Sequence, residues 1–175
     1  LVYRDHEKDE LSHYSAGTVD IEYIYPFGQS ELWGIANRTD YDLNAHQSAS
    51  KQNLEYHDPV TNEKYIPYVI EPSLGLGRAF LAFICDAYTE DEERGVVLKI
   101  HNDLAPFKMC VMPLQKQQQD QAFEIYQTLA KKYMVEYDSS GNIGKRYKRQ
   151  DSIGTPYCIT VDFDTADDES VTIRD

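Results

Sequence analysis

The sequence predicts a mixed α+β and α/β protein made of two units. Residues 18–27, "TVDIEYIYPF", alternate apolar and polar side chains with the period of a strand. Residues 108–175 alternate strand-like runs with amphipathic helical runs, which is typical of an α/β layer. Between the two patterns lies the acidic cluster "TEDEERG", 89–95, which indicates a solvated connection. We therefore expect two domains, 1–94 and 95–175.

The elements of the first unit follow from the spacing of apolar and turn-forming residues. The alternation predicts a strand with Val19, Ile21, Tyr23, Tyr25 and Phe27 on one face. The turn-prone "PFGQS" leads to a second strand, "ELWGIAN". Then come a short helix or loop at 42–52, a strand, Asp-Pro turn and strand at 54–72, and a helix from about Gly77 to Tyr88. The apolar stripe of this helix predicts burial, and consists of Phe80, Leu81, Ile84, Cys85 and Tyr88.

The second unit has a different order of elements. "KMCVMPL" is a strand, and an amphipathic helix follows at 116–134. "VEYD" is a short strand, and "SSGNIGKRYKRQDSIGTP" is a turn that leads to a basic helix. "YCITVDFD" and "SVTIRD" predict a pair of strands around the polar turn "TADDE". The amphipathic helix would bury Ala122, Ile125, Tyr126, Leu129 and Tyr133.

Composition and charge exclude several classes. The formal net charge of −13 argues against a general nucleic-acid coat, although a local basic patch stays compatible with it. The three cysteines are far apart, so neither a disulfide framework nor a zinc ribbon is indicated, and a reducing cytoplasmic location is expected. No apolar run approaches the roughly 20 residues of a membrane span, and no secretory signal is present, so no membrane partner is expected. The chain begins with Leu1 rather than Met, and we interpret it as a fragment of a longer protein.

The first candidate site is the joint between a strand and a helix in "YVIEPSLGLGRAFLAFICDAY", 68–88. Glycines at 75 and 77 would let backbone approach a ligand, and the helix start would favour an anion. Arg78 has the planar fork that suits phosphate oxygens, and Glu71 is a plausible Mg²⁺ ligand. The alternative is that the glycines only form the turn and Arg78 pairs with Glu71.

The second candidate is Glu31, at the start of the strand in "SELWGIANRTDYDL", 30–43. A carboxylate that faces inward needs a cation, which would be Arg38 or the ammonium group of a ligand. If Glu31 points to solvent, it has no such meaning.

The third candidate is the basic cluster "GKRYKRQD", which contains Lys145, Arg146, Tyr147, Lys148 and Arg149. Its cations could hold phosphates and its tyrosine could stack on a base. The alternative is an ordinary solvated helix. The five histidines, His6, His13, His46, His57 and His101, are expected at surface or turn positions.

Three segments in order carry a family resemblance. "YVIEPSLGLGRAFLAFICDAY" resembles motif 3 of class II aminoacyl-tRNA synthetases. "ELWGIANRTDYDL" and "IGKRYKRQDSIGTPYCITVDFD" resemble, more narrowly, the dimeric type of glycyl-tRNA synthetase. The resemblance covers nearly the whole chain. It implies part of an antiparallel-sheet catalytic domain, followed by most of an α/β anticodon-binding domain with a mixed sheet.

The resemblance also implies roles for individual residues. Arg78 would bind the γ-phosphate of ATP, and Glu71 would lie by the phosphates and help to hold Mg²⁺. Glu31 would pair with the ammonium group of glycine, and Ser73 would line the amino-acid pocket. No residue is expected to act as a nucleophile, because activation of glycine depends on positioning and charge neutralisation.

The partners implied are tRNA(Gly), glycine, ATP and a second subunit in a homodimer, with Lys145, Arg146, Tyr147 and Arg149 as candidate tRNA contacts. Motifs 1 and 2 of the family are not found in these residues. We therefore expect a glycine–tRNA ligase as the parent protein and a piece that is inactive by itself. The alternative is a non-catalytic, synthetase-like subunit that binds nucleic acid.

Overall fold

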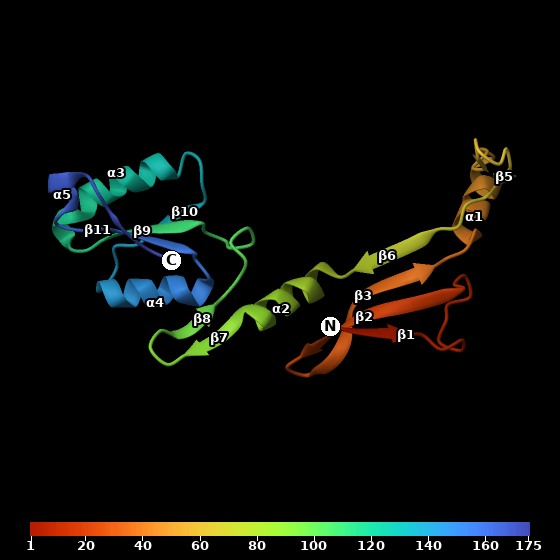
Figure 1. Cartoon of the computed structure of the whole chain (residues 1–175), viewed down its shortest axis with the longest axis horizontal. Coiled ribbons are helices and arrows are strands. Elements are labelled where there is room, and N and C mark those ends of the chain that lie inside the picture. Colours follow the sequence, from red (N-terminus) through yellow and green to blue (C-terminus); the bar gives the residue numbers. More distant parts are fainter. The chain divides into compact units, whose positions relative to one another are not determined.

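A computed structural model describes residues 1–175 and separates them into two compact units, Leu1–Cys85 and Asp86–Asp175 (Figure 1). The first is built on an antiparallel sheet and the second on a mixed sheet with helices, so the predicted fold class is confirmed. The division by contacts precedes the predicted boundary after residue 94, and the domain boundary itself stays a prediction.

The sheet of the first unit has the strand order β1-β2-β3-β6, with every neighbouring pair antiparallel. Its strands are β1 (Val2–Asp5), β2 (Gly17–Tyr25), β3 (Gly28–Asn37) and β6 (Ile70–Leu74). Gly28 joins β2 to β3 with a φ of 122°, a backbone conformation that glycine adopts without a steric penalty. Ile21 pairs with Trp33 and Glu22 pairs with Glu31, so Leu32 is an extra residue that forms a bulge in β3.

The covered side chains of β2 differ from the predicted apolar face. The predicted apolar face includes Phe27, which instead lies in the turn, is 71% exposed and stacks on Tyr25. The most covered side chains of β2 are Asp20, Glu22 and Tyr25. A strand whose buried positions carry carboxylates is organised around polar chemistry rather than around an apolar core.

An excursion of the chain separates β3 from β6. It consists of α1 (Tyr41–Ser50), β4 (Tyr56–His57) and β5 (Lys64–Tyr65), and β4 pairs with β5 as a short hairpin. Figure 1 shows α1 and β5 together beyond the ends of β3 and β6. α1 has no buried residue, which agrees with its polar sequence.

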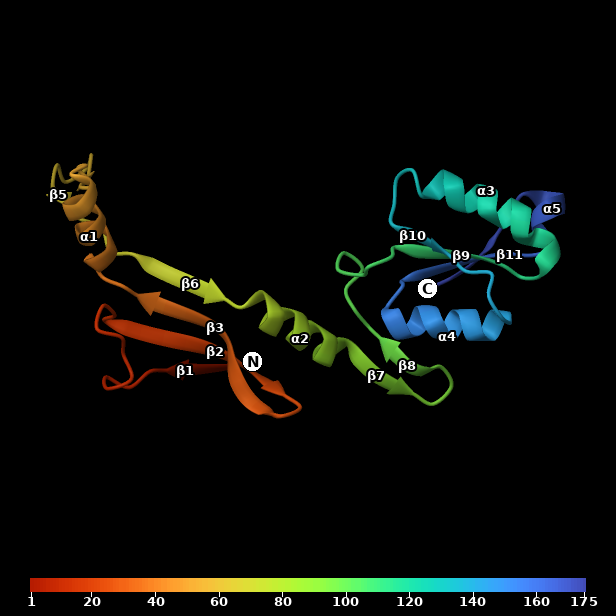
Figure 2. The ribbon, with the colours of Figure 1, turned by 180° about the vertical axis from the view of Figure 1, so that it is seen from behind.

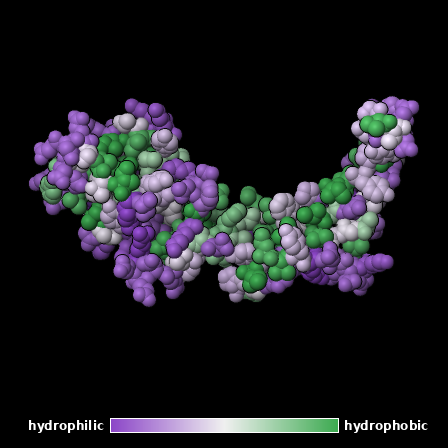
Figure 3. Space-filling view, in the orientation of Figure 1, coloured by the Kyte–Doolittle hydropathy of each residue, from purple (hydrophilic) through white to green (hydrophobic).

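The helix after β6 is α2 (Leu76–Ala87), and the predicted burial of its apolar stripe is wrong for this chain. Phe80 is 66% exposed and Leu81 is 40% exposed, whereas the buried positions are Ala79, Ala82 and Ala87. Figure 3 shows hydrophobic surface over α2. Residues 1–175 therefore do not cover the large apolar side chains of this helix.

The second unit begins with a hairpin of β7 (Tyr88–Asp91) and β8 (Gly95–Leu98). The acidic cluster 89–95 therefore forms most of β7 and the turn of a hairpin, and its residues are mostly exposed. Its role as a connection between domains stays a prediction. The Asp91 side chain accepts hydrogen bonds from the backbone N–H groups of Glu93 and Arg94, which fixes the turn.

The main sheet of the second unit has the order β10-β9-β11-β12. The three strands β10 (Val135–Tyr137), β9 (Met109–Pro113) and β11 (Tyr157–Val161) are parallel, and β12 (Thr172–Arg174) is antiparallel at the edge. η1 (Lys116–Gln118) leads into α3 (Gln119–Leu129), and a short α5 (Thr165–Asp168) separates β11 from β12. Figures 1 and 2 show α3 on one face of the sheet and α4 (Ile143–Ile153) on the other.

The core of this unit has two sides, because the central strand alternates its side chains between the two helices. Val111 and Val161 are fully buried and pack towards α3 with Ala122, and Ile125, Tyr126 and Leu129 cover them. Cys110, Met112 and Cys158 are buried on the α4 side, next to Ile143 and Tyr147. Tyr133 lies beyond the end of α3 and is 51% exposed, so it does not extend the predicted stripe.

Candidate functional site

One face of the antiparallel sheet brings the predicted site residues of the first unit together. In the register of the strands, Asp20 lies opposite Gly34, and Gly34 lies opposite Ser73. Side chains directly opposite one another in an antiparallel pair lie on the same face. Glu71 is two residues before Ser73 and therefore shares that face. The sheet thus gathers the polar groups of three strands, which are far apart in the sequence.

The absent side chain of Gly34 leaves a hollow between two carboxylates. An ideal Cβ at this position would lie 3.4 Å from Asp20 Oδ1 and 3.4 Å from Glu31 Oε1. Asp20 is buried, and its Oδ2 lies 2.7 Å from His6 Nε2. Two carboxylate oxygens this close to one stretch of backbone would attract a small cation, such as an ammonium group, into contact with both of them.

Glu31 has a cationic partner, but it is not the predicted one. Arg78 Nη1 lies 3.2 Å from Glu31 Oε2 and donates to the Glu31 backbone carbonyl at 2.7 Å. Both side chains are about half exposed, at 52% and 48%. Ion pairs with this exposure contribute little to stability, so a charged ligand could replace either partner.

Glu71 also has a cationic partner. Arg38 Nη1 donates to Glu71 Oε2 at 2.8 Å. The same guanidinium makes two hydrogen bonds to Asp42, at 2.6 and 2.9 Å, and lies 4.0 Å over the ring of Tyr14. The two carboxylates raise the pKa of Arg38 above its ordinary value, and Arg38 lowers the pKa of Asp42. This arrangement holds one oxygen of Glu71 and leaves the other for a ligand.

The two ion pairs in the structure are therefore the reverse of the two that the sequence suggested. Arg78 contacts Glu31 rather than Glu71, and Arg38 contacts Glu71 rather than Glu31. Ser73 is exposed beside Gly34 in the register. The sequence pattern did not single out Asp20 and Gly34, which the register places on the same face. A carboxylate and a glycine inside adjacent strands were a signal for both, but recognising it required the register.

The basic helix α4 presents its candidate residues very differently from one another. Arg146 is only 5% exposed, and all four of its recorded acceptors are backbone carbonyl oxygens. Tyr147 donates to or accepts from Thr160 at 2.6 Å, and the guanidinium of Arg174 lies 4.1 Å over its ring. Arg149 bonds the buried Asp138 at 2.6 and 2.9 Å. Lys145 is exposed at the start of the helix.

Two findings bound the chemistry of the chain. No group of three or more His, Cys, Asp or Glu side chains is arranged to hold a metal ion. No helix is long and apolar enough to cross a membrane.

Comparison with known proteins gives a consistent picture. The family described as "Anticodon binding domain" matches residues 108–175. The chain is 60% identical over its whole length to glycine–tRNA ligases of Ruminiclostridium cellulolyticum and Acetivibrio thermocellus, and 58% identical to that of Caldanaerobacter subterraneus subsp. tengcongensis. It spans 39% of the length of each of these relatives.

The alignment with these relatives covers both the sheet with the paired carboxylates and the α/β unit. The chain is therefore similar over its whole length to a part of these glycine–tRNA ligases, and its residues 108–175 match the anticodon-binding family.

Proposed function

We propose that the full-length protein is a glycine–tRNA ligase, which activates glycine with ATP to glycyl-adenylate and transfers it to tRNA(Gly). The observation that carries this proposal is the 60% identity to proteins of that name along all 175 residues. The alternative, a non-catalytic subunit that binds nucleic acid, has no observation in its favour.

We assign the amino-acid pocket to the hollow at Gly34. Glu31 would bind the ammonium group of glycine, with Asp20 on the other side, and Ser73 would line the pocket. A pocket for glycine gains nothing from a side chain, so it must hold the ammonium group and exclude larger residues by size. A narrow hollow between two carboxylates meets both requirements.

We assign the phosphates of ATP to the neighbouring end of the same face. Arg78 is half exposed and could exchange Glu31 for a γ-phosphate, which suits its planar fork. Glu71 retains a free carboxylate oxygen and is of the type that Mg²⁺ prefers. The metal ion would neutralise phosphate charge when bound. The donor set thus fits ATP and Mg²⁺.

The remaining partners follow from the second unit and from the relatives. We propose that tRNA(Gly) binds residues 108–175, with Lys145 as an exposed cation that could meet a phosphate. A homodimer and a cytoplasmic location belong to the same proposal, and the three free cysteines support the latter. We do not propose that Arg146 touches RNA, because it is buried.

The test is glycine-dependent exchange between ATP and pyrophosphate, followed by charging of tRNA(Gly), with the full-length protein. We expect exchange with glycine and not with alanine or serine. The 175 residues alone, without motif 2, should give no exchange. The proposal is wrong if ATP–pyrophosphate exchange depends on a different amino acid or if glycine supports no exchange.

A further inference from the structure

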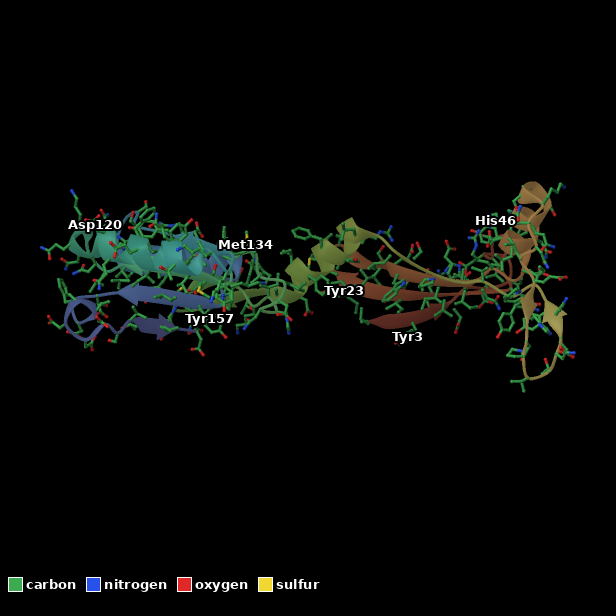
Figure 4. All side chains as sticks on the ribbon, turned by 90° about the horizontal axis from the view of Figure 1, so that it is seen from above. Tyr3, Tyr23, His46, Asp120, Met134 and Tyr157 are labelled. Atoms are coloured by element: carbon green, nitrogen blue, oxygen red, sulfur yellow. The ribbon has the colours of Figure 1, made fainter.

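The carboxyl ends of the three parallel strands of the second unit form a continuous rim. The backbone N–H of Leu114, just after β9, donates to Val161 at the end of β11 at 2.7 Å. The N–H of Asp138, just after β10, donates to Val111 at 3.1 Å. We define the carboxyl rim as residues 113–118, 138–142 and 161–165. Figure 4 shows Asp120, which follows this rim, at the opposite end of the unit from Met134 and Tyr157.

The topology indicates that this rim is the face that receives a ligand. The order β10-β9-β11 means that the chain leaves the central strand first to one side and then crosses to the other. Open α/β sheets take their ligands outside the carboxyl ends of the strands at such a point of reversal. If residues 108–175 bind tRNA, as the proposed function holds, the carboxyl rim is where the RNA would dock.

Arg146 donates hydrogen bonds to two segments of the carboxyl rim, the end of β9 and the loop 138–142. One Nη donates to the carbonyl of Pro113 at the end of β9. The other donates to Ser139 at 3.1 Å and to Gly141 at 2.6 Å, and Nε donates to Ser140 at 3.3 Å. Every bond therefore reaches a backbone oxygen of the rim.

This use of an arginine depends on its shape rather than on its charge. A guanidinium has five N–H donors in one plane, so it can serve several carbonyls at once, whereas a lysine has one compact ammonium group. Removal of the guanidinium would leave buried carbonyl oxygens without donors, which is costly. At 5% exposure the side chain has no surface left for a phosphate.

A second, weaker clamp acts on the same segment. The carboxylate of Asp138 accepts from the N–H of Ser140 at 2.9 Å and from Arg149. Arg149 also donates to the Ser140 carbonyl at 2.7 Å. Two arginines of α4 therefore hold the loop 138–142, whose last residue, Asn142, is the N-cap of α4.

We propose that Arg146 is a positioning residue for RNA: it fixes the loop 138–142 against the end of β9, and it does so without contacting the RNA. This proposal rests on the proposed function, because it takes tRNA to be the ligand. It assigns to Arg146 a role distinct from that of Lys145, its neighbour in the sequence, which is exposed and can meet a phosphate.

The test measures the affinity of the full-length protein for tRNA(Gly) at several salt concentrations. Loss of a phosphate contact lowers the slope of log affinity against log salt by about one. Arg146→Gln should weaken tRNA binding by about tenfold, because the displaced loop loses about as much as one base contact contributes. The slope of log affinity against log salt should not change. Lys145→Gln should lower the slope. Arg146→Lys keeps the charge and should not restore affinity, because the planar fork is missing.

Lys131→Gln is the matched control, since Lys131 is an exposed cation beyond the end of α3 and makes no bond to the rim. It should change neither affinity nor slope. If Arg146→Gln lowers the slope as Lys145→Gln does, or if Arg146→Lys restores full affinity, Arg146 acts by its charge and the proposal is wrong.

Hydrogen exchange separates loosening of the rim from loss of the fold. In Arg146→Gln, amides of 138–142 should exchange faster while those of β9 and β11 stay protected. Should this variant unfold the domain, Arg146→Lys replaces it, since a lysine keeps the buried charge but cannot serve all four carbonyl oxygens at once. That variant should weaken tRNA binding at constant slope, and unchanged affinity would overturn the proposal. Glycine-dependent exchange must stay normal in all variants; its absence in the unmodified protein would instead contradict the proposed function.

Discussion

Arg78 Nη1 lies 3.2 Å from Glu31 Oε2, so the arginine proposed to bind ATP and the glutamate proposed to bind glycine contact each other. The Arg78 backbone carbonyl also accepts from Tyr25 at 3.3 Å, which ties the start of α2 to β2. The pair couples the two halves of the proposed pocket: each charge is neutralised until a ligand takes its partner's place. Since both side chains are half exposed, this exchange should cost little.

The first prediction concerns that arginine. In the full-length protein, Arg78→Ala should raise the KM for ATP in glycine-dependent exchange by about tenfold or more, because a charge-assisted phosphate contact is lost. Arg94→Ala is the control, since Arg94 is an exposed cation in the turn between β7 and β8. Equal effects of the two variants, or no effect of Arg78→Ala, would contradict the assignment of the phosphate site.

The second prediction concerns the hollow at Gly34. In Gly34→Ala, the new methyl group would lie 3.4 Å from both Asp20 Oδ1 and Glu31 Oε1, a close contact that narrows the space in front of the two carboxylates where the ammonium group is proposed to bind. The KM for glycine should rise strongly while the KM for ATP changes less. Gly17→Ala is the matched control, because a Cβ there meets nothing within 4 Å. A normal KM for glycine in Gly34→Ala would place the amino-acid pocket elsewhere.

The third prediction concerns the stability of the second unit. Gly154 ends α4 with a φ of 76°, and a Cβ there would lie 2.6 Å from Ile100 Cγ2 and 2.9 Å from the Leu98 carbonyl. Gly154→Ala should lower the free energy of unfolding of this unit by more than about 2 kcal/mol, from backbone strain and overpacking together.

Gly141→Ala isolates the backbone part of that effect. Gly141 has a similar φ of 72°, but its Cβ would meet only Lys145 Cδ at 3.9 Å. This variant should lose only about 1–2 kcal/mol, the cost of a left-handed conformation. Hydrogen exchange of β9 and β11 reports both losses. Equal losses would show that the contacts with Ile100 and Leu98 do not matter.

The fourth prediction concerns Cys110 and Cys158, which lie opposite each other in β9 and β11. Burial raises the pKa of both thiols above the ordinary value of 9.0. In the folded state they stay protonated as the pH rises past 9, whereas in the unfolded state they ionise. Their contribution to the free energy of unfolding is therefore constant below about pH 9 and decreases above it.

Urea unfolding at pH 7 and pH 10 measures this dependence, with the double variant Cys110→Ala, Cys158→Ala as the reference. The loss of stability between the two pH values should be smaller in the double variant. Iodoacetamide should modify Cys85, which is only partly buried, long before the two core thiols. Rapid modification of Cys110 in the folded protein would refute the assignment of inert core thiols.

The helices and strands of the second unit were predictable because local pattern and tertiary role agree there. The stripe of Ala122, Ile125 and Leu129 has helical spacing and packs on the sheet as expected. α2 has an equally clear apolar stripe, yet Phe80 and Leu81 are exposed. Periodicity states which side chains could be buried together, but burial also requires a surface to cover them.

The sequence names members of a candidate site, whose role stays a prediction, but it does not give their geometry. Glu31, Glu71, Ser73 and Arg78 were named from motifs, and the sheet does place them on or beside one face. Their pairing could not be predicted, because ion pairs depend on the register of three strands and on where Arg38 enters the structure. The four α4 candidates, all named from one basic cluster, differ in role because a helix turns successive side chains to different surroundings.

The sequence by itself determined the composition of the two units, the kinds of most elements in each, and which residues can carry charge and hydrogen bonds. Only the tertiary structure decided that Asp20 and Glu31 flank the open position at Gly34, that Arg38 rather than Arg78 holds Glu71, and that Arg146 is buried under a loop. The physical reason is that propensity and periodicity reflect residues close together in the sequence. These contacts join residues that a whole strand, a helix or the segment between β3 and β6 separates in the sequence.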